Sequence, residues 1–342
     1  MTSEQKSAVN VVFGAMTFGK AGAEQSRVHD LDTAKAILDI FQKHGHNEVD
    51  TARAYGVGSS EEMLGDLKWQ ERGIVLDTKY YPTANFAGPN AVPGWSTDGH
   101  LDEKGLRENL EKSLKALKTA QVDMWYLHGP DRTVPHEVTL KAVNDLYKEG
   151  KFKRLGVSNY MAWEVAQMSE LCKQNGWKAI DVYQGVYNSL HRAIELELLS
   201  CLRKYGIAFY NYNPLAGGYL TDRYHRDDTD VESGCRFDAS KWQGKMYRGR
   251  YWNDQYFDAL DILRPVAEKH GLTEAECALR WMTNHSQLQR KHGDAIIIGA
   301  SSVKHIEQNL IDLEKGPLPE EVVQALDQGW EGCKAISQKY FH

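Results

Sequence analysis

The sequence predicts an α/β fold, a (β/α)8 TIM barrel with long substrate loops at its C-terminal rim. Two patterns carry this prediction: short apolar, β-branched runs alternate eight times with segments of helical period, and polar residues follow the ends of successive runs. Each crossover returns the chain beside the preceding strand, which favours a closed parallel sheet. An open doubly wound sheet is the alternative. No G-x-G-x-x-G follows the first run, so a Rossmann nucleotide site is not expected there.

The expected strands are short and regularly spaced. In chain order they are Val9–Phe13, Glu48–Asp50, Ile74–Lys79, Met124–Leu127, Leu155–Ser158, Asp181–Gln184, Ala208–Tyr212 and Ala295–Ile298. Helical periodicity is clearest after Asp102, before Asn175-Gly176, before Tyr205-Gly206, from Gln255 to His270 and from Thr273 to His285. In the third of these segments, Leu196, Leu199 and Leu202 are expected to share the apolar face.

Two stretches are too long for ordinary barrel loops. They are Pro82–Leu101, with Gly and Pro throughout, and Tyr219–Asp254, rich in Arg, Tyr, Gly and Trp. Long loops on a compact barrel are usually functional lids or disordered segments. Their aromatic and arginine content favours ordered substrate walls.

Composition describes an ordinary globular protein, expected to form one domain over residues 1–342. The apolar fraction is 42% and the charged fraction 26%, both usual for such proteins. A net charge of −6 leaves no basic surplus to neutralise phosphates, which argues against a nucleic-acid partner.

Cysteine usage and hydropathy predict a cytoplasmic protein. The five cysteines are scattered and form no C-x-x-C pair, which indicates reduced thiols and no zinc or other metal site. The first ten residues lack a hydrophobic signal core, and no apolar run approaches the ~20 residues that a membrane span needs.

Four residues together indicate a type of reaction. Tyr55 offers an acid, Lys79 a cation to lower the pKa of its phenol, and Asp50 a carboxylate to hold that cation. His128 can donate to a substrate oxygen and stabilise the alkoxide that develops there. This set suits protonation of a carbonyl oxygen while a hydride reaches its carbon. Taken singly, each residue could equally be a cap, a half-buried aromatic or a rim residue.

Polar groups recur where the expected strands end. Strands two to seven end in Asp50, Lys79, His128, Ser158-Asn159, Gln184 and Tyr212. The C-terminal rim of such a barrel is where chemistry occurs, so these side chains are expected to converge on one pocket. A purely structural pattern would not need polar groups at six consecutive strand ends.

Motifs spread from about Val11 to the C-terminus resemble those of the aldo-keto reductases. The matching segments are GAMTFG at 14–19, VDTARAYG at 49–56, YLHGPD at 126–131, GVSNY at 156–160, YQGVYN at 183–188, NPLAGGYL at 213–220 and GASSVKHIEQNL at 299–310. YRGRYW and LRWMTNHSQLQ make the chain most similar to the branch of aflatoxin-aldehyde and succinic-semialdehyde reductases. The resemblance implies a (β/α)8 barrel, NADPH and carbonyl reduction.

The same resemblance assigns roles to individual residues. Tyr55 would be the proton donor, tuned by Lys79 and Asp50, and His128 would orient the carbonyl. The nicotinamide carboxamide would lie against Ser158, Asn159 and Gln184, with Tyr212 stacked on its ring, although plain barrel-top packing is an alternative for Tyr212. An aromatic face of this kind determines which side of the nicotinamide is exposed.

A phosphate site is expected where Gly299–Ser302 opens a helix. The free N–H groups and dipole of a helix start attract anions, and this is the recurrent phosphate position of these barrels. Candidates for the 2′-phosphate and adenine are Ser301, Ser302, Lys304, Gln308 and Asn309; Ser301 or Ser302 could also be a simple N-cap. From the resemblance, the loop with Asn213, Leu215, Gly217 and Arg223 would cover the pyrophosphate, and Arg236 would add a charge. His305 stands where many members have an arginine, which makes a preference for NADPH over NADH less secure.

Substrate residues are implied at two positions. Arg250 matches the family position that binds a substrate carboxylate, a task that suits a guanidinium. The family pairs it with a terminal arginine, whereas this chain ends in His342, so acidic semialdehydes are expected to be poorer substrates. Trp95, Trp252 and Tyr224 could add apolar walls or simply pack within loops.

Three functions remain open from the sequence. The first is reduction of a small-molecule aldehyde or ketone with NADPH. The second is an NADPH-binding regulatory subunit with little turnover, like the potassium-channel β subunits of the superfamily. The third is an oxidoreductase that tailors a secondary metabolite. The resembling branch forms dimers, so a homodimer is expected.

Overall fold

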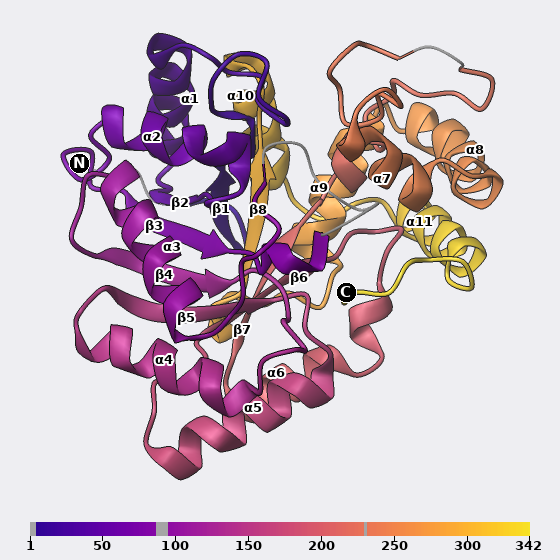
Figure 1. Ribbon diagram of the computed structural model, residues 1–342. Coiled ribbons are helices and arrows are strands. Elements are labelled where there is room, and N and C mark those ends of the chain that lie inside the picture. The colour runs from indigo at the N-terminus through magenta and orange to yellow at the C-terminus, as the bar shows by residue number, and fades with distance from the viewer. Residues whose placement is uncertain (1–4, 87–94, 229–230) are drawn as a thin grey trace.

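Eight parallel strands close into a barrel in chain order, and β1 is hydrogen-bonded to both β2 and β8 (Figure 1). The computed structural model describes residues 5–86, 95–228 and 231–342. The strands are β1 (Asn10–Gly14), β2 (Glu48–Asp50), β3 (Val75–Tyr80), β4 (Val122–Leu127), β5 (Phe152–Ser158), β6 (Val182–Val186), β7 (Ala208–Tyr212) and β8 (Ala295–Gly299). The predicted barrel is confirmed, and each predicted strand overlaps an observed one.

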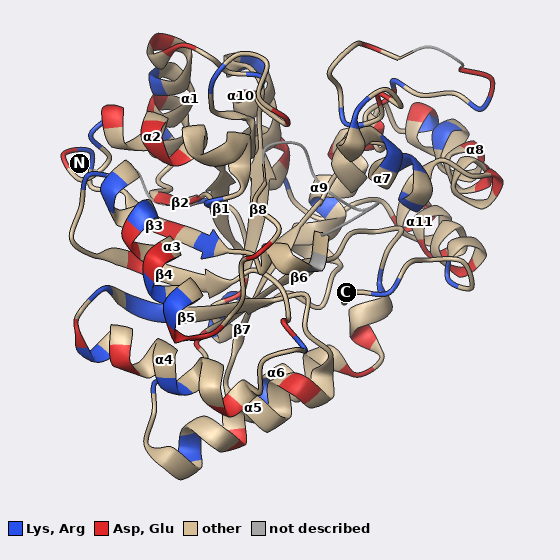
Figure 2. Ribbon diagram, viewed as in Figure 1, with Lys and Arg blue, Asp and Glu red and all other residues tan. Residues whose placement is uncertain are grey.

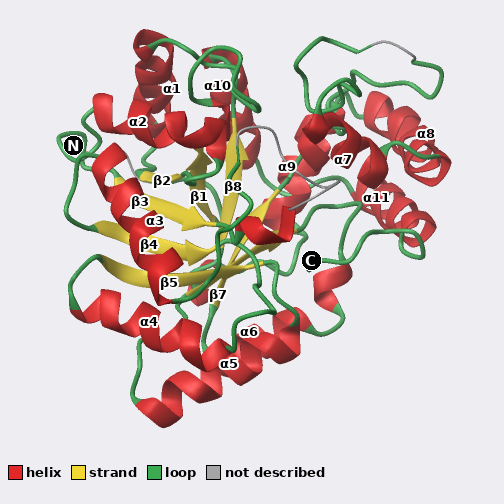
Figure 3. Cartoon of the chain, viewed as in Figure 1, coloured by secondary structure: helices red, strands yellow, loops and turns green. Residues whose placement is uncertain are grey.

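Helices surround the barrel on its outside (Figure 3). They are α1 (Leu31–Lys43), α2 (Ser59–Asp66), α3 (Glu103–Ala116), α4 (His136–Lys148), α5 (Ala162–Asn175), α6 (Leu198–Tyr205), α7 (Trp242–Tyr251), α8 (Asp254–Lys269), α9 (Glu274–Asn284), α10 (Val303–Leu313) and α11 (Glu320–Cys333). Their apolar faces pack on the outer side of the strands, while a second apolar cluster fills the barrel interior. Among the described helices, none combines the length and apolar character needed to traverse a bilayer.

Helix ends follow the chemistry of their capping residues. The side chains of Asp102 and Thr273 accept backbone N–H groups at the starts of α3 and α9. Gly176 and Gly206 end α5 and α6 in the left-handed conformation, which glycine adopts without a steric penalty. These ends agree with the predicted ones, because a cap is determined by the residues next to it.

Three details differ from the sequence prediction. Leu196 precedes α6 and is 77% exposed, so it does not share the buried face of that helix. Glu197 is the N-cap residue, and α6 therefore begins two residues after Leu196, later than the apolar spacing predicts. Gln184 is the third of five residues in β6, so it does not end its strand. The long stretch 219–254 contains α7 and leads directly into α8, at the right of Figure 1.

The pleat of the strands sorts charged residues to the two faces of the barrel wall. Successive side chains of a strand point to opposite faces. In β3, Thr78 faces outward to Glu61, whereas Lys79 faces inward to Asp50. Along the outer helices, acidic and basic residues are interspersed (Figure 2). Charge inside the barrel is therefore a separate feature from the solvated charge outside.

Candidate active site

The four residues predicted to carry the chemistry meet at the C-terminal rim. Lys79 Nζ lies 2.6 Å from Asp50 Oδ2 and 3.5 Å from the Tyr55 hydroxyl. The rings of Tyr55 and His128 meet edge to face, with centroids 5.9 Å apart. These residues come from the ends of β2, β3 and β4 and from the loop after β2, so the barrel brings together positions 78 residues apart in the sequence (50 to 128).

Lys79 and Asp50 are held from several directions. The Lys79 ammonium also donates to the carbonyl oxygen of Thr51 at 2.6 Å. The second carboxylate oxygen of Asp50 accepts a hydrogen bond from Gln184 Nε2 at 2.9 Å. Since both charged groups are buried, a fixed set of partners keeps them in one geometry. Two of the three ammonium donors are thereby occupied, and the remaining one is available to Tyr55.

Burial opposes both charges of this pair. It raises the pKa of Asp50 and lowers the pKa of Lys79, while the charge of each partner acts in the opposite direction. Tyr55 differs from the prediction of a lowered pKa: loss of water around the phenol, followed by the negative charge of Asp50, raises its pKa well above the ordinary value. The phenol is therefore protonated at neutral pH, which is the form required of a proton donor.

His128 is a neutral imidazole in this environment. Burial, followed by the charge of Lys79, lowers its pKa well below the ordinary value. Its Nδ1 is buried with no hydrogen-bond partner among the described residues, while Tyr81 packs edge-on against its ring at 5.5 Å. A neutral imidazole so placed can donate one hydrogen bond to an oxygen beside Tyr55.

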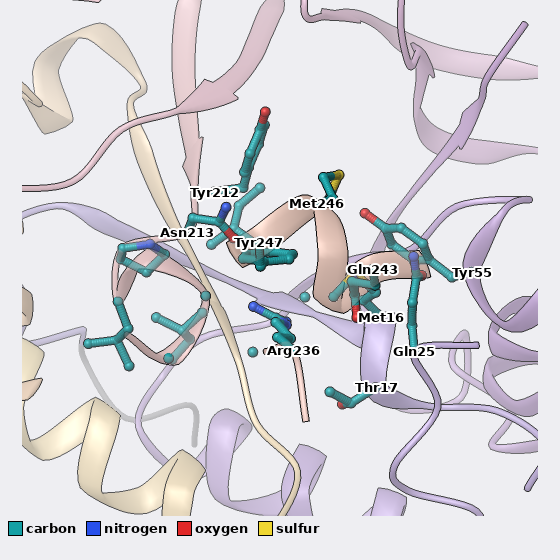
Figure 4. Close-up of a pocket in the computed structure, with 18 of the residues that line it drawn as sticks. Met16, Thr17, Gln25, Tyr55, Tyr212, Asn213, Arg236, Gln243, Met246 and Tyr247 are labelled. Carbon is teal, nitrogen blue, oxygen red and sulfur yellow. Dashed lines mark hydrogen bonds between the residues drawn. The ribbon is translucent and has the colours of Figure 1, made fainter. Parts of the chain in front are cut away.

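A cavity of ≈ 1110 Å³ opens above the four residues and extends across the rim to β8 and the start of α10. In the close-up, Tyr55 lies on one side of this cavity and Tyr212 with Asn213 on the other, with Arg236 between them (Figure 4). The predicted catalytic, cofactor and substrate residues that line it are Asp50, Tyr55, His128, Asn159, Gln184, Tyr212, Asn213, Leu215, Gly217, Arg223, Arg236, Arg250, Ser301, Lys304, Gln308, Asn309 and His342. Three predicted residues, Lys79, Ser158 and Ser302, lie behind the wall instead.

Side chains at the ends of β5 and β7 form one hydrogen-bonded group at the cavity wall. The Tyr212 hydroxyl donates to Asn159 Oδ1 at 2.9 Å, and Asn159 Nδ2 contacts Ser158 Oγ at 3.0 Å. Asn159 Nδ2 also donates to the carbonyl of His128 at 2.9 Å. This group links the cavity wall to the backbone of His128, and Ser158 contacts Asn159 without lining the cavity itself.

The far end of the cavity suits an anion. The side chain of Ser302 accepts the backbone N–H of His305, so it is an N-cap of α10. Lys304 at this helix start lines the cavity together with Arg223 and Arg236, and the first N–H groups of a helix favour a nearby anion. Gly217 has φ +73°, and a Cβ there would lie 2.2 Å from the Tyr247 ring, so only glycine lets the loop pass this closely.

Among the described residues, four further aromatic rings line the cavity beside His128, and the sequence predicted only one of them, Trp95. Tyr81, Phe86 and Trp95 of the β3–α3 loop contact one another at 5.1–6.1 Å between centroids, and Trp242 of α7 meets Phe86 edge to face at 5.9 Å. Of the predicted walls, Trp95 and Tyr224 line the cavity. Trp252 instead packs among Tyr224, Phe237 and Phe257 within the loop cluster. The aromatic content of the two long stretches was the available signal.

Arg250 and His342 approach the cavity from α7 and the C-terminus. Arg250 is 7% exposed, and its Nε donates to Gln338 Oε1 at 3.1 Å. The surrounding protein, followed by the charge of Arg250, lowers the pKa of His342 to about 4. One permanent cation therefore stands beside a ring that is neutral at neutral pH.

Comparison with known proteins decides the family. The model of the aldo/keto reductase family matches residues 10–331. The chain belongs to the aldo/keto reductase family. This membership makes the protein an oxidoreductase that reduces carbonyl groups, in a family that generally uses NADH or NADPH.

Individual relatives cover nearly the whole chain. An aldo-keto reductase of Pseudocercospora fijiensis is 53% identical over 89% of this chain and 100% of its own length. The aldo-keto reductase pigE of Monascus ruber is 47% identical over 97% of each chain. The human aflatoxin B1 aldehyde reductase member 2 is 44% identical over 93% of this chain and 87% of its own. The predicted similarity to the aflatoxin-aldehyde reductase branch is confirmed.

Proposed function

We propose that this protein reduces aldehydes or ketones to alcohols with NADPH and that Tyr55 gives the proton. One observation carries the proposal: the Tyr55 hydroxyl lies 3.5 Å from a lysine that is itself held 2.6 Å from a buried carboxylate. That arrangement stands at the base of a cavity with an anion-binding far end. A phenol, an ammonium and a carboxylate in this order are suited to proton donation.

The residues of the cavity fit a dinucleotide. Asn213 Nδ2 is buried in the wall without a hydrogen-bond partner among the described residues. At the far end, Arg223, Arg236 and Lys304 stand beside the N–H groups of α10, a donor set that matches phosphate. Arg223, expected from the sequence to cover the pyrophosphate, has its Nη2 3.4 Å from His305 Nε2 of α10, so Arg223 and Lys304 would instead favour the extra 2′-phosphate of NADPH over NADH. His305 adds no charge, because burial and Arg223 lower its pKa.

The residues of the cavity would position the cofactor and the substrate, and Tyr55 would supply the proton. When bound, the reduced nicotinamide supplies the hydride; Tyr212, Asn159 and Gln184 would hold its ring and carboxamide. The substrate oxygen would lie between Tyr55 and His128, where it accepts one hydrogen bond from each. As negative charge develops on that oxygen, the Tyr55 proton moves to it and the Lys79 ammonium stabilises the phenolate left behind.

The walls favour neutral, flat carbonyl compounds. Tyr81, Phe86, Trp95 and Trp242 offer ring faces and edges beside the reactive end of the cavity. Arg250 offers one cation for a carboxylate, and His342 offers none at neutral pH. Carboxylate-bearing aldehydes are therefore expected to bind more weakly than neutral aromatic ones.

Replacing Tyr55 by Phe tests the proposal. The variant keeps the ring that lines the cavity and removes only the acidic hydroxyl, so kcat for a neutral aromatic aldehyde should fall by about 10²- to 10⁴-fold. NADPH affinity should stay near the wild-type value, measured by quenching of tryptophan fluorescence, since Trp95 and Trp242 line the cavity. Unchanged turnover in Tyr55→Phe would end the proposal. Tight NADPH binding with no turnover of any carbonyl by the wild type would favour a regulatory role instead.

A further inference from the structure

A second set of charged groups lies inside the barrel, one layer below the reactive residues. Asp77 of β3 is fully buried, and neither of its carboxyl oxygens has a hydrogen-bond partner among the described residues. It pairs in register with Asp50 on one side and with Met124 on the other. Since side chains two positions apart in a strand share a face, Asp77 lies on the same inner face as Lys79. The mechanism above does not use it.

Charged groups from the neighbouring strands surround Asp77. They are Glu48 and Asp50 of β2, Lys79 of β3 and Arg154 of β5, and the uncharged phenols of Tyr126 in β4 and Tyr210 in β7 lie in the same interior layer. Lys79 is bound to Asp50 at 2.6 Å, and Arg154 Nη2 is bound to Glu48 at 2.6 Å. The nearest cation contact of Asp77 is Arg154 at 3.7 Å, beyond hydrogen-bond distance. Lys79 and Arg154 are therefore shared among three carboxylates, and Asp77 has the longest of these ion pairs and no hydrogen bond among the described residues.

An ionised carboxylate that is fully buried, accepts no hydrogen bond and has one long ion pair is unfavourable, whereas the neutral acid is tolerated. Burial, followed by the negative charge of Glu48, raises the pKa of Asp77 well above its ordinary value. With Asp77 neutral, the interior holds two cations and two anions and is electrically balanced. With Asp77 ionised, a third negative charge would lie beneath the Lys79 ammonium.

We propose that Asp77 is a positioning residue for the reductase reaction, held as the neutral carboxylic acid so that Lys79 stays directed at Tyr55. This inference rests on the proposed role of Tyr55. When Asp77 loses its proton, its carboxylate competes for the Lys79 ammonium and its charge makes the phenol a weaker acid. Carbonyl reduction then declines at alkaline pH, and the titration of Asp77 sets where the decline begins.

Asp77→Asn tests this, because an amide has nearly the shape of a neutral carboxylic acid and cannot ionise. At neutral pH, kcat of the variant should stay within a few-fold of wild type. The decline of kcat at alkaline pH, the alkaline limb of its pH profile, should begin about one pH unit or more higher than in the wild type. Met124→Leu, which changes the same interior layer with little change in volume and none in charge, is the matched control and should leave the limb in place. A limb that does not move in Asp77→Asn overturns the proposal.

Stability against pH provides a readout that needs no activity. The native state holds the Asp77 proton at pH values where the unfolded chain, with an ordinary pKa near ~3.9, has released it. Wild-type stability should therefore fall relative to Asp77→Asn as pH rises above that value, by up to tenfold in the folding equilibrium constant per pH unit. Urea unfolding of both proteins from acidic to alkaline pH measures the difference.

The outcomes separate the two proposals. A stability difference that does not grow with pH shows that Asp77 is ionised and overturns its proposed neutral state. If Asp77→Asn does not fold, urea unfolding of the wild type alone decides, because a neutral Asp77 makes its stability fall as pH rises above the ordinary carboxyl pKa, and the absence of that fall overturns the proposal. Retained turnover in Tyr55→Phe contradicts the proposed function and leaves the stability result untouched. A growing stability difference together with an unmoved kinetic limb shows a neutral Asp77 without a positioning role, and the proposal is then wrong.

Discussion

The two ends of the cavity hold charge in different ways. At the reactive end, Asp50 and Lys79 are buried on adjacent strands and share a 2.6 Å contact. At the anion end, Arg223 comes from a loop, its side chain is 45% exposed, and its nearest acidic partner is Glu232 at 3.7 Å. The reactive end is formed by strands β2 and β3 of the barrel, and the anion end is formed partly by the loop between β7 and α7.

The two ends therefore have different tasks: the reactive end fixes the geometry of the catalytic groups, and the anion end contributes to cofactor affinity. A buried pair is weakly screened, so the position of each atom alters both pKa values and stability. An exposed cation is screened by salt and contributes mainly attraction for an anion. We therefore expect changes at the reactive end to alter kcat and folding, and changes at the anion end to alter cofactor affinity in a salt-dependent way.

The largest effect is expected for Lys79→Met. Without the ammonium at 3.5 Å, nothing stabilises the phenolate that forms at Tyr55, so kcat should fall by about 10²- to 10⁴-fold. NADPH affinity should change little, because Lys79 does not line the cavity. Steady-state kinetics and fluorescence titration measure the two quantities. An equal loss of affinity and turnover would contradict the separation of the two ends.

Asp50→Asn should destabilise the fold more than any exposed pair can. The substitution leaves the Lys79 ammonium buried without its anion, which costs about 3–5 kcal/mol in comparable cases. Asp66→Asn is the matched control, since Asp66 contacts Lys118 at the same 2.6 Å on the exposed surface and should leave the free energy of unfolding nearly unchanged. Urea unfolding compares them, and equal losses would show that burial does not distinguish these pairs.

Arg223→Ala should weaken NADPH binding by roughly ten-fold, about 1.4 kcal/mol, at low salt. The loss should shrink as salt rises and should be smaller for NADH, which lacks the 2′-phosphate. Arg226→Ala is the control: this arginine lies in the same loop but pairs with Asp254, Asp258 and Asp261 and does not line the cavity. A salt-independent loss would place Arg223 outside the anion site.

His342→Arg gives the smallest expected effect and adds a permanent cation where the wild-type ring is neutral. The kcat/KM for an aldehyde that carries a carboxylate should rise a few-fold relative to that for its neutral analogue. The gain should disappear when Arg250→Ala is added, since both cations would hold one carboxylate. Equal changes for acidic and neutral aldehydes would show that this corner of the cavity does not recognise the carboxylate.

The sequence predicted the barrel because its evidence is local. Strand–helix alternation, caps such as Asp102 and stops such as Gly176 depend on neighbouring residues, and all were found. The convergence of Asp50, Lys79 and His128 followed from the rule that strand ends of a barrel share one rim. Leu196 was misplaced because the start of a helix, not apolar spacing alone, decides which residues share its face.

Electrostatic detail could not be predicted in the same way. The sequence suggested a lowered pKa for Tyr55 from the proximity of Lys79, yet loss of water around the phenol has the larger effect. Nor could the sequence predict that Ser158 and Ser302 do not line the cavity that their neighbours Asn159 and Ser301 line. Such outcomes depend on how much protein surrounds a group, which no spacing in the sequence records.

By itself, the sequence determined which residues form strands and helices and which polar groups stand at the barrel rim, because both follow from short-range periodicity and chain order. Only the tertiary structure decided that Asp77 has no hydrogen-bond partner among the described residues, that aromatic rings from two loops wall one cavity, and that His342 is neutral beside Arg250. Those properties arise from burial and from contacts between distant segments, and these exist only once the chain has folded.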